Sequence, residues 1–132
     1  MYLLDTHILL WARLDPARLS KAHQQIITSP DAKKYFSSVS LWEISLKFSL
    51  GKLELGSHNP DDFLETANEL GLFVSAPEPV HYASIYRLEK IPNHKDPFDR
   101  MLIWQAIQSK MTLLSNDAKF REYSPQGLAL AY

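Results

Sequence analysis

Short apolar runs alternate with helical stretches along the whole chain, and this alternation limits the fold more than any other feature. The period and composition of the runs predict strands at residues 2–4, 35–39, 72–75 and 111–114, with a fifth, edge strand at 128–131. Helices are predicted at 6–13, 20–28, 40–51, 59–71, 79–90 and 97–110, and a short one follows Asp117. Strands separated by helices need crossover connections. We therefore expect one α/β domain over residues 1–132, with a mainly parallel, doubly wound sheet.

Acidic residues stand where the predicted strands end or the helices begin. The segments are Leu3-Leu4-Asp5-Thr6-His7, Ser40-Leu41-Trp42-Glu43, His94-Lys95-Asp96-Pro97-Phe98-Asp99-Arg100 and Leu113-Leu114-Ser115-Asn116-Asp117. Such positions gather at one edge of a parallel sheet. Two carboxylates about 4 Å apart repel by roughly 4 kcal/mol at an effective dielectric near 20. The pattern therefore predicts a divalent ion held by oxygen ligands, Mg²⁺ or Mn²⁺, and phosphate chemistry.

Helix capping is the competing explanation for each acid. It accounts well for the acids that directly precede helices, which are Asp5, Asp96 and Asp117. Glu43 follows Ser40 at the spacing of a capping box, and Asp99 lies in a first helical turn, where the helix dipole favours an acid. However, Ser40 and Asp96 already supply those two caps. Glu43 and Asp99 are therefore surplus to capping, which favours the metal site.

Four neighbouring polar residues are candidates for supporting roles. The hydroxyls of Thr6 and Ser115 are suited to fixing a carboxylate, although for Thr6 we favour a hydrogen bond within its own helix start. Asn116 is suited to touching phosphate or orienting Asp117, and Arg100 to contacting an RNA backbone or neutralising the acidic pocket.

Three further sets of side chains have a structural explanation that is at least as good as a functional one. Lys47 is placed to contact RNA or to form an i,i+4 ion pair with Glu43. His7 and His94 are suited to proton transfer, but a lone histidine is more often structural or on the surface. The tryptophans Trp11, Trp42 and Trp104 are expected to pack in the core or in a dimer contact.

Composition fits such a site without proving it. The 132-residue chain carries 14 basic and 15 acidic residues, so an acidic pocket of five carboxylates leaves a mildly basic remaining surface. The absence of cysteine restricts metal ligands to oxygen and nitrogen. The start lacks a basic segment, and the apolar runs are too short to cross a bilayer. We expect a cytoplasmic protein without a membrane partner.

Taken together, the acidic segments resemble the PIN-domain family, specifically the VapC-type toxins of bacterial toxin–antitoxin pairs. The segments SLWEISLKFSLGKL and HKDPFDRMLIWQA extend the likeness, and the second is its most specific part. The resemblance implies a three-layer α/β/α sandwich with strand order 3-2-1-4-5. It assigns metal binding and catalysis to Asp5, Glu43, Asp99 and Asp117, with Asp96 as a further acid at the rim. His7 stands where such proteins often have Asn.

The expected function is a Mg²⁺- or Mn²⁺-dependent endoribonuclease that uses metal-activated water. It would be the toxin of a toxin–antitoxin pair, acting as a homodimer and inhibited by an antitoxin protein. The apolar residues of the 97–110 helix, together with Leu10, Trp11, Phe48 and Leu50, are expected to supply contacts with other chains. The alternatives are a catalytically silent PIN module that binds RNA or protein, a metal-dependent phosphatase, and a DNA nuclease.

Overall fold

A single five-stranded parallel sheet forms the centre of the protein. The computed structural model describes residues 1–132, and its strands are β1 (Tyr2–Leu4), β2 (Lys34–Ser37), β3 (Phe73–Ser75), β4 (Thr112–Leu114) and β5 (Ala129–Ala131). Their order is β3-β2-β1-β4-β5 and every pair is parallel. The expected strand order and parallel pairing are confirmed. Since β1 lies between β2 and β4, the residues that follow these three strands meet at one edge.

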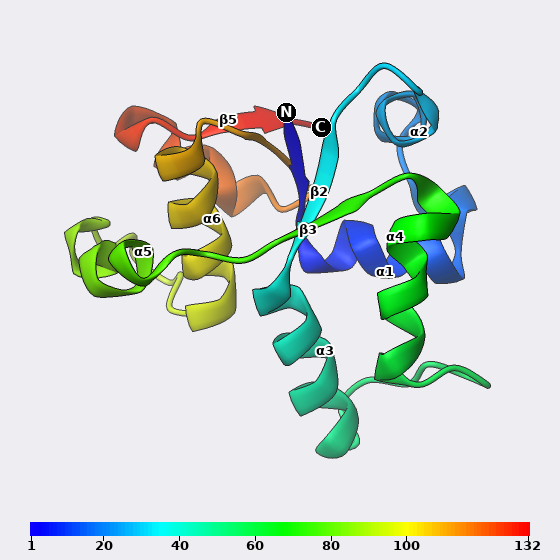
Figure 1. The fold of residues 1–132 in the computed structure, drawn as a ribbon. Helices are drawn as coiled ribbons and strands as arrows, with labels where there is room; N and C mark the ends of the chain where they lie inside the picture. Colours follow the sequence, from blue (N-terminus) through cyan, green and yellow to red (C-terminus); the bar gives the residue numbers. More distant parts are fainter.

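Helices cover both faces of the sheet (Figure 1). Their bounds are α1 (Thr6–Leu14), α2 (Lys21–Thr28), α3 (Ser38–Ser49), α4 (Phe63–Leu70), α5 (Pro79–Ser84) and α6 (Pro97–Ser109), with 3-10 helices η1 (Pro16–Arg18), η2 (Pro60–Asp62), η3 (Ile85–Arg87) and η4 (Ala118–Gln126). Leu4 and Leu114 pack in the core on the side of α1, α2 and α4, whereas Leu3 and Leu113 pack against α6 and η4. Successive strand residues point to opposite faces, so two core layers form around the sheet.

Four predicted helices differ from the observed ones in their bounds or type, and one of them, at 59–71, divides into η2 and α4. The prediction that Ser40 begins a helix is wrong, because α3 starts at Ser38 and the hydroxyl of Ser37 accepts a hydrogen bond from the Val39 N–H at 3.1 Å. The 79–90 segment forms α5 and the shorter η3 instead of one continuous helix. The helix after Asp117 is a 3-10 helix.

The apolar residues of α6 pack inside the chain's own core. Met101, Leu102, Ile103 and Trp104 are all buried, which removes the reason to expect a contact with another chain at this helix. Large apolar side chains are exposed instead on α3 and just after it, at Trp42, Leu46, Phe48 and Leu50. No helix has the length and apolar character that crossing a membrane requires.

Candidate metal centre

Three acids at the carboxyl edge of the sheet cap the helices that follow them. The side chain of Asp5 accepts a hydrogen bond from the Ile8 N–H at 2.8 Å, that of Asp96 from the Asp99 N–H at 2.9 Å, and that of Asp117 from the Lys119 N–H at 2.9 Å. Capping therefore operates at these positions, as the competing explanation requires. It also fixes the direction in which each carboxylate leaves the backbone.

Glu43 lies inside α3 and is 2% exposed, so it does not cap a helix. Its Oε1 accepts a hydrogen bond from the Thr6 hydroxyl at 2.7 Å, and its Oε2 forms an ion pair with Lys47. The i,i+4 pair considered for Lys47 is thus present. The favoured interpretation of Thr6 is wrong, because its hydroxyl reaches from α1 to α3, where it also contacts the Ser40 hydroxyl at 2.9 Å. Two elements therefore hold one buried carboxylate in place.

Asp99 responds electrostatically to the other acids of the set. Burial, together with the negative charges of the other acids, raises the pKa of Asp99 to about 7. Burial has the largest effect, followed in order by the charges of Asp96, Glu43, Asp5 and Asp117. Burial also raises the pKa of Asp5, although hydrogen bonds from the Ser115 hydroxyl and the Ile8 N–H oppose that rise. The acids named from the sequence thus lie close enough to repel one another, which is the condition that a divalent cation relieves.

The tightest group of metal-ligating atoms includes a histidine. One ligand atom each from His94, Asp99 and Asp117 lie within 4.8 Å of one another. Asp5 and Glu43 are outside this group, so the predicted acids share one region without forming a single ligand shell. Sequence reasoning underrated His94, which is buried. The available signal was its position inside the most specific acidic segment, next to Asp96 and Asp99.

A hydrogen-bond network orients His94 behind this group. Its Nε2 lies 3.3 Å from Asp99 Oδ2, and its Nδ1 lies 2.6 Å from the hydroxyl of the fully buried Tyr123. Arg100 Nη1 donates to the same hydroxyl at 3.0 Å. If Nδ1 carries the proton, it donates to Tyr123 Oη and leaves the Nε2 lone pair free for a cation. Metal-binding histidines are commonly oriented by a second hydrogen bond of this kind.

The remaining predicted residues have simpler surroundings. Ser115 is buried, and its hydroxyl accepts a hydrogen bond from the Asp117 N–H at 3.1 Å in addition to its bond with Asp5. Arg100 donates from Nη2 to the Leu88 carbonyl at 2.8 Å, so it anchors the segment before α6. Asn116 is exposed.

Comparisons with known proteins identify the family and the fold. The model of the PIN domain family matches residues 2–124. The structure of VapBC2 from Rickettsia felis bound to a promoter DNA fragment is similar, with a TM-score of 0.68, 18% identity, and coverage of 98% of this chain and 96% of that one. FitAcB from Neisseria gonorrhoeae gives a TM-score of 0.62, 20% identity and coverage of 100% and 97%.

VapBC-1 from nontypeable Haemophilus influenzae gives a TM-score of 0.60, 17% identity and coverage of 98% and 96%. A search of curated proteins found no match. At these identities the solved structures establish the fold, whereas the family model covers nearly the whole chain. The chain therefore belongs to the PIN domain family.

Proposed function

We propose that the protein is a metal-dependent endoribonuclease that hydrolyses RNA phosphodiester bonds. The observation that carries this proposal is the convergence of His94, Asp99 and Asp117 beside further acids that help to raise the pKa of Asp99 to about 7. Membership of the PIN domain family supports nuclease chemistry. The ribonucleotide preference and the dependence on metal are the new parts of the proposal.

The donor set fits a divalent ion such as Mg²⁺ or Mn²⁺. Asp99 and Asp117 would bind it, with His94 as an added nitrogen ligand. Asp5 and Glu43 would add two further carboxylates close to the ion. When bound, such an ion neutralises the phosphate and activates water for attack. Thr6 and Lys47 keep Glu43 oriented, and the Ser115 hydroxyl does the same for Asp5. Asp96 would be a further acid at the rim; its side chain caps α6, and among the acids its charge has the largest effect on the pKa of Asp99.

We further propose that the protein works with an antitoxin as part of a toxin–antitoxin pair. The similar solved structures include VapBC and FitAB complexes, which supports a protein partner. An apolar hollow of ≈150 Å³ lies between α3, α5 and α6, where Trp42 packs edge-on against Phe98 at a centroid distance of 4.9 Å. This hollow would accept an antitoxin segment, and a basic residue of that segment would compete with the metal for the acids.

We also propose a homodimer. Because α6 is buried, the dimer contact would use exposed apolar residues at the end of α3 and in the following turn, separate from the antitoxin hollow, with Phe48 40% and Leu50 58% exposed. Side chains of this size gathered on one helix are typical of surfaces that another protein covers.

Cleavage of RNA by the purified protein tests the catalytic proposal. Wild type with Mg²⁺ or Mn²⁺ should cut a single-stranded RNA, and EDTA should stop it. Asp99→Asn and Glu43→Gln should abolish cleavage, because each removes a charge and keeps the side-chain shape. Asp96→Asn is the matched control, since Asn retains the helix cap, and it should keep more activity.

Two results would contradict this assignment. Equal and complete loss at Asp96 and Asp99 would show that the rim acid is as essential as the central one. Undiminished cleavage in EDTA would remove the metal from the reaction. If a DNA strand of the same sequence were cut at the same rate, the protein would be a less selective nuclease instead of a ribonuclease.

A further inference from the structure

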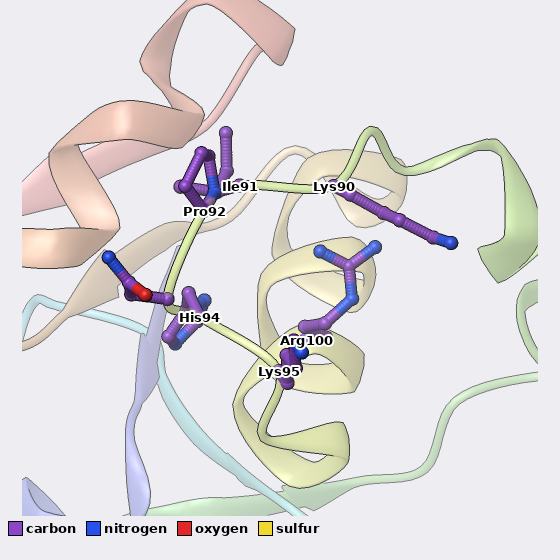
Figure 2. A pocket seen from close by; sticks show the side chains of 7 residues that line it. Lys90, Ile91, Pro92, His94, Lys95 and Arg100 are labelled. Carbon is purple, nitrogen blue, oxygen red and sulfur yellow. The ribbon is translucent and has the colours of Figure 1, made fainter.

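A hollow of ≈440 Å³ has His94 in its lining. It is lined almost entirely by the segment that leads into α6, with residues Lys90, Ile91, Pro92, Asn93, His94, Lys95 and Arg100. Figure 2 shows the side chains of Lys90 and Arg100 extending to the same side of this segment. Because His94 also belongs to the candidate metal group, the hollow and the metal site share a wall.

A tight turn builds this hollow. The His94 N–H donates to the Ile91 carbonyl at 3.2 Å, and Asn93 has a φ of 64°. Proline at the second position and a left-handed residue at the third are typical of a type II turn. Ile91 and His94 form an antiparallel bridge, and Lys90 and Lys95 are the residues that flank it along the chain. The turn therefore places two lysines at the ends of one short segment of the hollow's lining.

The positive charges of the hollow have no carboxylate partners. The chain's close acid–base pairs are Arg13–Glu69, Lys47–Glu43, His58–Asp62 and His94–Asp99, of which the histidine pairs are ionic only when the ring is protonated. None of these pairs involves Lys90, Lys95 or Arg100. Arg100 donates hydrogen bonds to the Leu88 and Glu89 carbonyls and to the Tyr123 hydroxyl. Arg100 thus forms part of the hollow's lining, while Lys90 and Lys95 are exposed and carry positive charge that no ion pair neutralises. An anion bound here would pair with this positive charge.

The hollow continues into a second one of ≈550 Å³ that shares Lys90, Lys95 and Arg100 with it. This second hollow adds Arg87, Tyr86 and the acid Glu89, and Tyr86 is 77% exposed. Arg87 holds the tyrosine in place, with its guanidinium carbon 5.6 Å from the ring centroid and its Nε donating to the hydroxyl at 3.3 Å. Cations that follow a backbone and an exposed aromatic ring are the elements with which proteins bind single-stranded nucleic acid.

We propose that residues 86–95 form an entry groove for single-stranded RNA, in which Lys90 and Lys95 bind a backbone phosphate and Tyr86 stacks on a base. The groove leads from the exposed tyrosine, past the lysines, to His94 and the metal site. This inference rests on the proposed ribonuclease function and names the part of the substrate that lies outside the reacting phosphate. Its ligand chemistry is a phosphodiester next to an unpaired base.

Salt-dependent binding tests the lysines. An RNA oligonucleotide of about ten unpaired uridines is bound to an Asp99→Asn protein in EDTA, so that no cleavage occurs, and anisotropy gives the affinity across salt concentrations. Each phosphate that the protein neutralises on a single strand contributes about 0.7 to the slope of log affinity against log salt. Lys90→Ala with Lys95→Ala should therefore flatten the slope by at least about 0.7. The control pair is Lys21→Ala with Lys33→Ala, both exposed and outside the groove, and it should leave the slope unchanged.

Affinity at fixed salt tests the tyrosine. Tyr86→Leu should weaken binding about fivefold or more, the loss expected for one stacked base, while Tyr86→Phe should bind like the parent. Tyr82→Leu is the control, because Tyr82 is 52% exposed but does not line the groove. Equal salt slopes for both lysine pairs, or equal losses for Tyr86→Leu and Tyr82→Leu, would overturn the groove.

The binding and cleavage assays together distinguish a failure of the proposed groove from a failure of the proposed ribonuclease function. If wild type with metal does not cut RNA but the lysine and tyrosine variants still change binding as expected, the groove stands and the ribonuclease proposal falls. If wild type cuts RNA and the groove variants bind and cut like their controls, the substrate enters elsewhere and the groove is refuted. Absence of any RNA binding by the parent protein would refute the groove as well.

Discussion

Replacing Asp99 with Asn should stabilise the metal-free protein at neutral pH. Burial disfavours the charged form of Asp99, and the surrounding acids repel its charge, so its pKa rises from 3.8 to about 7. Asn keeps the shape of the side chain without the charge. The variant should therefore lose metal binding and gain stability at the same position.

The size and sign of the effect follow from the pKa of Asp99. Below about pH 4 the carboxyl is protonated in both the folded and the unfolded chain, so it adds no pH dependence. Between about pH 4 and 7 the unfolded chain releases this proton before the folded one does, so stability falls as the pH rises. A rise from 3.8 to about 7, at about 1.4 kcal/mol per pKa unit, corresponds to a loss of up to about 4 kcal/mol by pH 7.

Urea unfolding in EDTA across about pH 4 to 8 measures this difference. At a typical urea dependence of about 2 kcal/mol per molar, the wild-type midpoint should fall by up to about 2 M between pH 4 and 7. The Asp99→Asn midpoint should fall by much less, and the remainder reports Asp5, whose pKa is also raised by burial. The two proteins should be close at the acidic end of this range and diverge above it. Midpoints that fall equally in both proteins would refute the electrostatic argument.

Three other predictions concern metal, Glu43 and assembly. Mg²⁺ or Mn²⁺ should raise the melting temperature of wild type, and the rise should shrink in Asp5→Asn; equal responses would mean that the acids are not the site. Thr6→Val should lower the free energy of unfolding measured in urea by about 1–3 kcal/mol, because it leaves the buried Ser40 hydroxyl and one Glu43 oxygen without a partner. Thr28→Val is the control, since Thr28 is exposed, and a smaller loss in Thr6→Val than in this control would contradict the role of Thr6. Light scattering at tens of micromolar should give a dimer mass, and a monomer there would exclude the proposed homodimer.

The overall architecture could be predicted because its signals are local. Strand-like runs separated by helical stretches indicate crossovers, and the residues that follow β1, β2 and β4 meet at one edge whatever the details of the packing. Caps at Asp5 and Asp96 are also visible in the sequence, since they involve the three residues that follow.

Features that depend on contacts between elements are not predictable from local patterns. Local signals place the start of α3 two residues late, because Ser37 and Ser40 are both acceptable caps and only the end of β2 decides between them. They assign Thr6 to its own helix, whereas its partners lie on α3. His94 has no local periodicity to mark it, and its orientation depends on Tyr123 from the other end of the chain.

In the proposed site the capping acids would serve two purposes, and this limits how the site can be lost in evolution. Asp5, Asp96 and Asp117 each start a helix, so the helix dipoles offset part of their charge before any metal is present. A descendant that abandoned catalysis would still need those helix starts. Asn or Ser would preserve them, while Ala would cost about 1 kcal/mol at each helix start. Silent relatives of this chain should therefore carry Asn or Ser at positions 5, 96 and 117, whereas position 99, which caps nothing, is free to become apolar.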